Sequence, residues 1–324
     1  MKSNLLQLLR ETDEYVSGEA LSAQLGVTRA AVWKAVQALR EQGYAIDAVP
    51  NRGYRLTASP DALTEDEILP GMQTRWLGRT VYHYAEVGST NVQARQEADR
   101  GAPDGSAFLA ERQTAGRGRL GRTWDSPASE GIWMSLLLRP PAAPQAMLPI
   151  TLVTGLAVCR ALRAQAGVDA RIKWPNDIVA GGKKVCGVLT EMSAEAEGIR
   201  HVIVGIGVNV NTQRFPVELQ ATATSLRLLT GQAQDRKALA QRLLLECETA
   251  FDLLLTDGFE AMRGEYRSFS ATLGQHVRAT GRDGAVEGIA RDITPGGDLV
   301  IDTAAGPVTV TSGEVSVRGI YGYA

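Results

Sequence analysis

The feature that most constrains this chain is a glycine- and arginine-rich segment at residues 114–127, with the sequence TAGRGRLGRTWDSP. Three glycines and three arginines alternate in it: Gly116, Arg117, Gly118, Arg119, Gly121 and Arg122. Glycine lets the backbone approach a ligand closely and adopt conformations that other residues avoid. Guanidinium groups supply forked donors for carboxylate or phosphate oxygens. The segment therefore predicts a loop that holds anions, and two of them at once.

Two other interpretations of this segment are possible. Its glycines fit G-x-G-x-x-G, the dinucleotide fingerprint, which opens a helix inside a βαβ unit and precedes an acidic residue by about 20 positions. Residues 122–127 begin a helix poorly, and no second strand with a terminal carboxylate follows. Glycine–arginine segments also occur as disordered nucleic-acid tails. The short length and the apolar runs on both sides favour an ordered loop.

Length and composition indicate a soluble protein of several domains. The 324 residues suffice for two or three domains, and 44% apolar and 22% charged residues are ordinary values. No uninterrupted apolar run approaches the roughly 20 residues of a membrane helix, and the first residues lack the core of a signal peptide. We expect a cytoplasmic protein that does not contact a membrane.

Cysteine and histidine usage points the same way. The chain has three of each: Cys159, Cys186, Cys247, His83, His201 and His276. An odd number of widely spaced cysteines is typical of reduced thiols in the cytoplasm. No cysteine or histidine lies near another at the spacing of metal ligands, so a zinc site is not expected.

Residues 1–62 predict a winged helix-turn-helix domain. A helix with Ser17 as N-cap ends at Gly26, and a longer helix capped by Thr28 ends before Gly43. Residues 44–56 then alternate like a hairpin, which makes the wing.

This module carries a local positive charge, +3 over residues 21–60, although the whole chain has a net charge of −2. We expect Arg29 and Lys34 on the second helix and Arg52 on the wing to contact operator DNA. A small helical packing domain with solvated charges is the alternative. Trp33 fits either the core or the DNA surface. Because one such module usually binds weakly, we also expect a homodimer.

Polar residues interrupt the apolar pattern of the central region at three places. Ser89, Thr90 and Asn91 follow an alternating stretch, and helix capping alone would explain them. In residues 172–178, IKWPNDI, a proline stops a strand and leaves Asn176 and Asp177 in a turn. Asp177 could hold Mg²⁺ beside phosphates, and an ordinary Asx turn is equally compatible.

The third place is a predicted hairpin followed by a buried strand. Gly181 and Gly182 join two β-rich runs, the second of which carries Lys184 and Gly187. A lysine beside a turn is usually only solvated. The buried strand that follows has Asn209 at its end.

Taken in order, these motifs resemble the biotin–protein ligase family. They are GSTN at 88–91, QTAGRGRLGR at 113–122, Trp124, KWPND at 173–177, KVCG at 184–187 and GIGVN at 205–209. With the winged helix, the chain resembles the bifunctional bacterial members, which are both ligase and repressor of the biotin operon. The resemblance spans essentially the whole chain.

The resemblance implies two reactions. Biotin and ATP would form biotinyl-5′-AMP and pyrophosphate, and biotin would then pass to a lysine of the biotin carboxyl carrier protein of acetyl-CoA carboxylase. The first reaction brings two anions together, which explains the arginines. Arg119 and Lys184 would be catalytic by stabilising charge in the transition state. Mg²⁺ would neutralise the pyrophosphate, through Asp177.

The resemblance also implies the binding roles. The biotin site would comprise Ser89, Thr90, Asn91, Gln113, Arg117, Gly118, Arg119, Lys184 and Gly187. The nucleotide site would comprise Trp124, stacked on adenine, with Asn176, Asp177 and Asn209. Residues 211–226 would close over the adenylate. Leu120 departs from the family, in which an arginine is common there.

From about Thr272, short β-rich runs separated by turns predict a small barrel, which the resemblance makes SH3-like. It would help to position ATP and the carrier, or only stabilise the chain. The expected organisation is α/β multidomain: a winged helix-turn-helix (1–62), an α+β ligase domain with a mixed sheet (63–270) and an SH3-like barrel (271–324).

Ligand-loaded protein would dimerise on operator DNA, with biotinyl-AMP as corepressor. The rival hypothesis is a regulator that senses biotin without catalysis. The set of Arg117, Arg119 and Lys184 argues against it, because sensing alone does not need three cations around a carboxylate.

Overall fold

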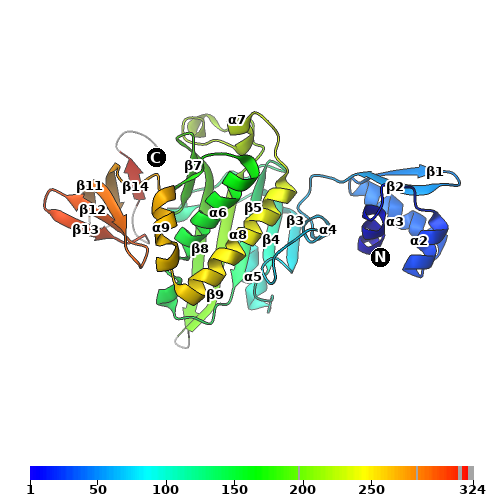
Figure 1. The fold of residues 1–324 in the computed structure, drawn as a ribbon, viewed down its shortest axis with the longest axis horizontal. Coiled ribbons are helices and arrows are strands. Elements are labelled where there is room, and N and C mark those ends of the chain that lie inside the picture. The colour runs from blue at the N-terminus through cyan, green and yellow to red at the C-terminus, as the bar shows by residue number, and fades with distance from the viewer. Residues whose placement is uncertain (196–197, 282–283, 313–315, 320–324) are drawn as a thin grey trace. The chain divides into compact units, whose positions relative to one another are not determined.

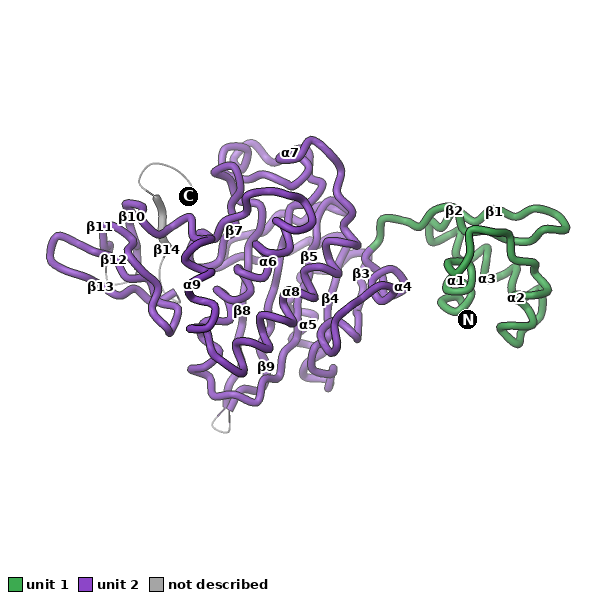
Figure 2. The backbone as a smooth tube through the Cα atoms, viewed as in Figure 1, with its two compact units in different colours: residues 1–62 green, residues 63–324 purple. Residues whose placement is uncertain are grey.

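The structure is a computed structural model, and it describes residues 1–195, 198–281, 284–312 and 316–319. The chain divides into two compact units, Met1–Ala62 and Leu63–Ala324 (Figure 2). Each unit has its own hydrophobic core.

The first unit has three helices and a hairpin: α1 (Lys2–Arg10), α2 (Gly18–Leu25), α3 (Arg29–Glu41), β1 (Ala45–Val49) and β2 (Gly53–Ala58). The side chains of Ser17 and Thr28 accept hydrogen bonds from backbone N–H groups at the starts of α2 and α3. Gly26 ends α2 with φ of 64°. The predicted helix-turn-helix is therefore confirmed, and a β-hairpin follows it.

The hairpin is attached to the helices through the segment before α2. Val16 and Tyr54 exchange two backbone hydrogen bonds, with N–O distances of 2.8 and 2.9 Å. Gly53 allows this contact, since a Cβ atom there would lie 2.0 Å from the Val16 carbonyl oxygen. A side chain at residue 53 would push the wing away from the helices.

The second unit is built on a mixed sheet of seven strands in the order β3-β4-β5-β9-β8-β7-β6. The strands are β3 (Val81–Val87), β4 (Ala107–Gln113), β5 (Gly131–Leu138), β6 (Arg171–Lys173), β7 (Asp177–Ala180), β8 (Lys183–Glu195) and β9 (Gly198–Asn209). Only β3 and β4 pair in parallel, and the other pairs are antiparallel. The predicted mixed sheet is present.

Helices cover both faces of this sheet. On β4, Phe108 packs in one cluster with Ala94 of α5 (Thr90–Asp99), while Leu109 faces the main core on the other side. That core contains α6 (Ile150–Ala166), α8 (Arg236–Asp257) and α9 (Glu260–Phe269), and Figure 1 shows α6 beside α8. Two short helices, α4 (Glu65–Ile68) and α7 (Leu226–Thr230), and the 3₁₀ turns Arg119–Gly121, Pro144–Met147 and Val217–Leu219 complete the unit.

One helical stretch, Pro144–Ala166, is long and apolar enough to cross a membrane by length and composition. Its most apolar window is 72% buried inside the structure, as expected of a core helix under a sheet.

A second, five-stranded antiparallel sheet follows α9. Its strands are β10 (His276–Gly281), β11 (Gly284–Ile293), β12 (Leu299–Thr303), β13 (Gly306–Val310) and β14 (Ser316–Gly319), in the order β13-β12-β11-β10-β14. The predicted β-rich module is present, but its described strands form an open sheet, with β13 and β14 at the edges. The predicted closed barrel is therefore not seen among them.

Candidate active site

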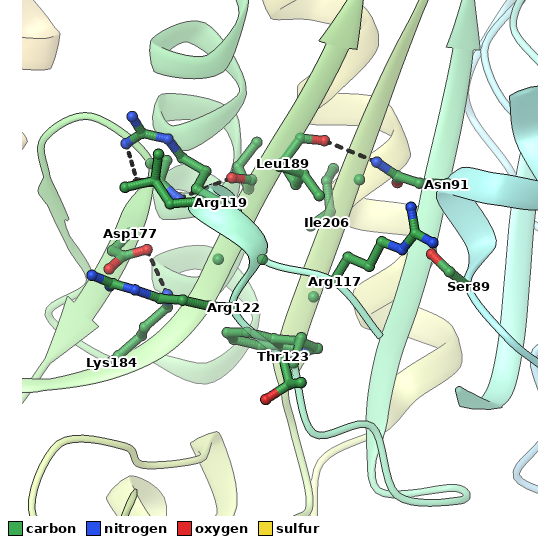
Figure 3. A pocket seen from close by; sticks show the side chains of 18 of the residues that line it. Ser89, Asn91, Arg117, Arg119, Arg122, Thr123, Asp177, Lys184, Leu189 and Ile206 are labelled. Carbon is green, nitrogen blue, oxygen red and sulfur yellow. Dashed lines mark hydrogen bonds and ion pairs between the residues drawn. The ribbon is translucent and has the colours of Figure 1, made fainter. Parts of the chain in front are cut away.

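The glycine–arginine loop borders a cavity of about 540 Å³ on the seven-stranded sheet (Figure 3). The predicted residues that line it are Ser89, Thr90, Asn91, Gln113, Arg117, Gly118, Arg119, Trp124, Asn176, Asp177, Lys184 and Gly187. One predicted residue does not line it. Asn209 lies at the end of β9, and its Nδ2 donates to the Thr224 carbonyl at 3.1 Å.

The loop is ordered by hydrogen bonds with itself. Trp124 N donates to the Gly116 carbonyl at 2.9 Å, and Gly118 N to the Arg122 carbonyl at 2.7 Å. The chain continues into β5, which runs antiparallel to β4. A dinucleotide fingerprint would be followed by a helix and a parallel strand, so the structure excludes that alternative. It also excludes a disordered tail.

The cationic end of the cavity lies where this loop faces β7 and β8. Arg119 donates from Nη1 to Asn176 Oδ1 at 3.1 Å and also donates to the backbone carbonyl of Ser312. Lys184 Nζ lies 2.6 Å from Asp177 Oδ1. Burial lowers the pKa of Arg119, and the charge of Asp177 opposes that shift. Arginine remains protonated in proteins, so a bound anion would meet two half-buried positive charges.

The KWPND turn is more than an Asx turn. Asn176 donates from Nδ2 to the Val188 carbonyl at 3.0 Å, and its Oδ1 accepts from Arg119. Asp177 forms an ion pair with Lys184 on the neighbouring strand. Both side chains therefore join the turn to the cavity.

Trp124 forms part of the cavity floor. A Cβ atom built at Gly207 would lie 2.6 Å from its indole ring, so a side chain there would displace the ring, and one at Gly187 would lie 3.1 Å from it, a tight contact. Lys184 Nζ is 5.0 Å from the ring centroid, a cation–π distance. Trp133 packs edge-on against Trp124 at 6.5 Å between centroids, a neighbour that the sequence did not suggest.

The opposite end of the cavity, at the start of α5, is lined by hydroxyl and amide groups, and Figure 3 shows Arg117 on this side, next to Ser89 in the view. Thr90 donates from its backbone N and from Oγ1 to Gln113 Oε1, at 2.8 and 3.1 Å. Ser89 occupies the N-cap position but makes no capping hydrogen bond with its side chain. Capping alone therefore does not explain these residues. Figure 3 shows Ser89 and Asn91 across the cavity from Asp177 and Lys184.

Two residues next to this polar end, the buried Ser135 and the partly exposed Glu191, were not predicted from the sequence. Ser135 on β5 lies within hydrogen-bond distance of Thr90 and Asn91, and Glu191 on β8 accepts from Asn91. Neither belongs to a motif, since one is a lone serine in an apolar strand and the other follows a β-rich run.

No group of three or more His, Cys, Asp or Glu side chains that could hold a metal ion occurs in the described ranges. Asp177 is a lone carboxylate in the cavity lining, beside an amide and a lysine. The carboxylate alone fits Mg²⁺, which is commonly held by one or two carboxylates, substrate phosphates and water, whereas the Lys184 ammonium cannot ligate a cation.

The predicted DNA-contacting residues lie on the surface of the first unit. Lys34 is exposed, Arg29 pairs with Glu19 of α2, and the Arg52 guanidinium lies 4.4 Å from the centroid of the Tyr15 ring. Trp33 is 54% exposed on α3, so it is not a core residue.

Three family models match the chain, in the order of its parts. An HTH domain model matches residues 2–55, the biotin/lipoate A/B protein ligase family model matches residues 87–209, and the biotin protein ligase C-terminal domain model matches residues 272–318.

Similar proteins extend this match over the full length. The "Bifunctional ligase/repressor BirA" of Bacillus spizizenii is 39% identical over 98% of this chain and 98% of its own. The "Biotin--[acetyl-CoA-carboxylase] ligase" of Mycobacterium tuberculosis is 38% identical over 71% of this chain and 86% of its own. The biotin protein ligase of Aquifex aeolicus, solved in complex with biotin and ATP, superposes with a TM-score of 0.66 at 34% identity, covering 74% of this chain and 99% of that one. The chain therefore belongs to the biotin–protein ligase family, and it matches the bifunctional ligase/repressors from end to end.

Proposed function

We propose that the protein activates biotin with ATP to biotinyl-5′-AMP, transfers biotin to a lysine of the biotin carboxyl carrier protein, and represses biotin-synthesis genes when loaded with the adenylate. The observation that supports the ligase activity is a cavity with hydroxyl and amide side chains at one end and Arg119 and Lys184 at the other. Biotin has the complementary pair of ends, a cyclic urea and a carboxylate.

In the first reaction, a biotin carboxylate oxygen bonds to the α-phosphorus of ATP, and pyrophosphate leaves with the electrons of the broken P–O bond. Arg119 and Lys184 offset the repulsion between the two anions and stabilise the charge of the transition state. Lys184 reaches the biotin carboxylate by leaving Asp177, its partner at 2.6 Å. Side chains only position the reactants and supply charge, because the carboxylate itself is the nucleophile.

Ser89, Thr90, Asn91 and Gln113, with the backbone of Arg117 and Gly118, hold the ureido ring in this proposal. Trp124 stacks on adenine, and Asn176 and Asn209 orient the nucleotide. Gly187 keeps the floor open beside Lys184.

The required cation is Mg²⁺, which neutralises the leaving pyrophosphate when bound. Asp177 would hold the ion, as a carboxylate commonly does for Mg²⁺ beside phosphates. In this proposal, Asp177 is freed for the metal when Lys184 turns to biotin.

Residues 211–226 protect the adenylate from water. This segment pairs with the backbone of Lys184 itself: Lys184 N donates to the Thr222 carbonyl and Thr224 N to the Lys184 carbonyl, both at 2.8 Å. Exclusion of water matters because a mixed anhydride hydrolyses readily. In the second reaction, the carrier's lysine amine attacks the acyl carbon, an amide bond forms, and AMP leaves.

The functional domains are 1–62, 63–270 and 271–324, and the last is an SH3-like barrel in this proposal. It is suited to support the active site, because Ser312 accepts from Arg119 and Gly297 accepts from the Trp174 indole at 3.0 Å. It also contributes to docking of the carrier.

For repression, the ligand-loaded protein forms a homodimer that binds operator DNA through Arg29, Lys34 and Arg52. Biotinyl-AMP orders the ligand-binding loops, and the dimer therefore binds it more tightly than the monomer does. This difference in ligand affinity shifts the population from monomer to dimer. The protein acts in the cytoplasm, where its three buried cysteines remain reduced.

The decisive experiment incubates the protein with biotin, ATP, Mg²⁺ and an apo carrier domain and measures biotin transfer. We expect transfer to depend on ATP. Tight biotin binding without transfer would instead support the rival, a non-catalytic biotin sensor.

Repression is tested separately by sedimentation and gel retardation with DNA upstream of the organism's own biotin-synthesis genes. Biotin with ATP should shift the protein towards a DNA-bound dimer. Equal dimerisation and DNA binding without ligand would contradict the coupling.

A further inference from the structure

A chain of hydrogen bonds runs behind the polar end of the cavity. Gln113 Nε2 donates to Ser126 Oγ at 2.8 Å, and Thr90 Oγ1 lies 3.1 Å from Gln113 Oε1. Ser135 Oγ lies 2.8 Å from Thr90 Oγ1 and 2.6 Å from Asn91 Oδ1. Thr90 and Asn91 line the cavity, whereas Ser135 is fully buried behind it.

Fixed partners set the orientation of both amide side chains. Gln113 must direct its oxygen to Thr90, because the backbone N–H of Thr90 can only donate. Asn91 must direct its nitrogen to the Leu189 carbonyl, at 3.3 Å, and to Glu191 Oε2, at 2.8 Å, because both groups only accept. The Asn91 oxygen therefore faces Ser135.

Gly205 on β9 leaves room for the Asn91 amide in this orientation. A Cβ atom built there would lie 2.2 Å from Asn91 Oδ1, so no other residue would leave the amide in place. The orientation of Asn91 is thus fixed by β5, β8 and β9 together.

The direction of the hydroxyl protons follows from these orientations. Asn91 Oδ1 only accepts, so Ser135 donates its single proton to it. Thr90 then donates its proton to a protein oxygen, either Gln113 Oε1 in the cavity wall or Ser135 Oγ behind it. In either case a Thr90 oxygen lone pair remains as the group available to a ligand.

We propose that Ser135 and Glu191 are positioning residues that make Thr90 an obligatory hydrogen-bond acceptor and so select a ligand ring with an N–H donor. The inference rests on the proposed function, in which that donor is a ureido N–H of biotin. A ring with an alkylated nitrogen or a ring oxygen at that position would leave the Thr90 acceptor unpaired in a desolvated site.

The test is Ser135→Ala, which removes the hydroxyl that donates to Asn91 and lies beside the Thr90 hydroxyl. The Thr90 hydroxyl is then able to rotate. We expect the biotin dissociation constant, measured by calorimetry, to rise by about tenfold, the loss typical of one buried hydrogen bond. The KM for ATP and kcat at saturating biotin should change by less than about threefold, because neither Ser135 nor Thr90 contacts the cationic end of the cavity.

A second measurement separates polarity from loose packing. The ratio of affinities for biotin and for biotin methylated at a ureido nitrogen should narrow by about tenfold in Ser135→Ala, because the rotated Thr90 hydroxyl no longer requires an N–H. The steric cost of the methyl group is common to both proteins, so it cancels when the ratio for Ser135→Ala is compared with the ratio for the unmodified protein. Glu191→Gln, which leaves Ser135 in place, should narrow the ratio in the same direction and by less.

Ser106→Ala is the matched control. Ser106 is also fully buried in this unit and donates to the Pro103 carbonyl at 2.7 Å, outside the cavity lining. Its loss should cost similar stability and leave biotin affinity unchanged.

An equal loss of biotin affinity in Ser106→Ala and Ser135→Ala, or an unchanged ratio in both Ser135→Ala and Glu191→Gln, would overturn the inference while the proposed function stood. Failure of the unmodified protein to bind biotin would instead overturn the proposed function first.

Discussion

The two units use positive charge in opposite ways. In the ligase unit, Arg119 and Lys184 are partly buried, and each has partners within the same cavity wall. In the helix-turn-helix unit, Lys34 is exposed, and Arg29 forms an ion pair whose two side chains are 68% and 78% exposed. One unit presents cations in a preorganised, shielded site, and the other presents them to solvent.

The difference shows what each unit can do with an anion. Shielded charges act strongly at short range and suit a transition state, because little water competes with them. Exposed charges are screened by salt and suit binding to a phosphate backbone, in which counterion release supplies affinity. Substitutions in the ligase unit should therefore change rates and stability, and those in the first unit should change DNA affinity with little effect on the chemistry.

The largest effect is expected for Lys184→Ala. Removing one preorganised charge should slow adenylate formation by about 10²–10³-fold, with a smaller loss of biotin affinity. Pyrophosphate release measures the rate, and calorimetry measures the affinity.

Lys183→Ala is the control on the same strand, since Lys183 Nζ donates to the Gln220 carbonyl and does not line the site cavity. It should slow adenylation by less than about threefold. Equal losses of rate and affinity in Lys184→Ala would contradict its role in the chemical step.

The next effect concerns stability and pH at Glu111, a carboxylate on β4 whose side chain is 13% exposed. Burial alone raises the pKa of Glu111, but hydrogen bonds from His83 and the Leu63 N–H, together with the charge of Arg236, lower that pKa to about 2. A lowered carboxyl pKa stabilises the fold above the unfolded pKa, near 4.5, and the contribution is lost as pH falls from about 4.5 to about 2. The contribution at neutral pH is about 3 kcal/mol.

Glu111→Gln should therefore destabilise the ligase unit by about 3 kcal/mol at pH 7, since it removes the carboxylate charge that pairs with the fully buried Arg236. Hydrogen exchange resolved by peptide measures each unit by itself. Glu86→Gln, in an exposed pair with Arg112 on the same two strands, should cost less than about 1 kcal/mol. If the free energy of unfolding of Glu111→Gln fell below pH 4.5 as steeply as that of the unmodified protein, the acid sensitivity would belong to other groups.

A smaller effect is expected in the first unit. Trp33 is 54% exposed on α3, beside Lys34, and an exposed aromatic there suits apolar contact with a thymine methyl in the major groove. Trp33→Ala should weaken binding to the upstream DNA by about tenfold without changing the salt dependence. Arg52→Ala should instead reduce the slope of log affinity against log salt by about one. A changed slope in Trp33→Ala would contradict the apolar contact, and neither variant should change the adenylation rate.

The sequence predicted those features that depend on residues close together in the chain. Ser17, Thr28 and Gly26 act within one turn of the chain, so the helix-turn-helix could be derived from local rules. The glycine–arginine loop and the KWPND turn also carry local signals, and the cavity brings them together. Closure of the last sheet depends on pairing between distant strands, which no local pattern encodes.

Ser135 and Glu191 show the limit within the site. Ser135 lies in a strand whose residues are all buried, and only register with β9, not sequence spacing, sets it beside Asn91. Glu191 lies 100 positions from Asn91, and nothing in its own segment marks it. Residues that contact a ligand tend to lie in motifs, whereas those that orient them depend on tertiary packing.

The smallest effect is expected at Leu120, where the family resemblance led us to expect arginine. Leu120 has φ of 56° at the tip of the loop and is 62% exposed, so a longer charged side chain has solvent to enter. Leu120→Arg adds a charge that water screens, unlike the partly buried Arg119, and should change the adenylation rate by less than about twofold. An increase of tenfold or more would show that an exposed cation can do the work of a shielded one, and the distinction between the two units would fail at this loop.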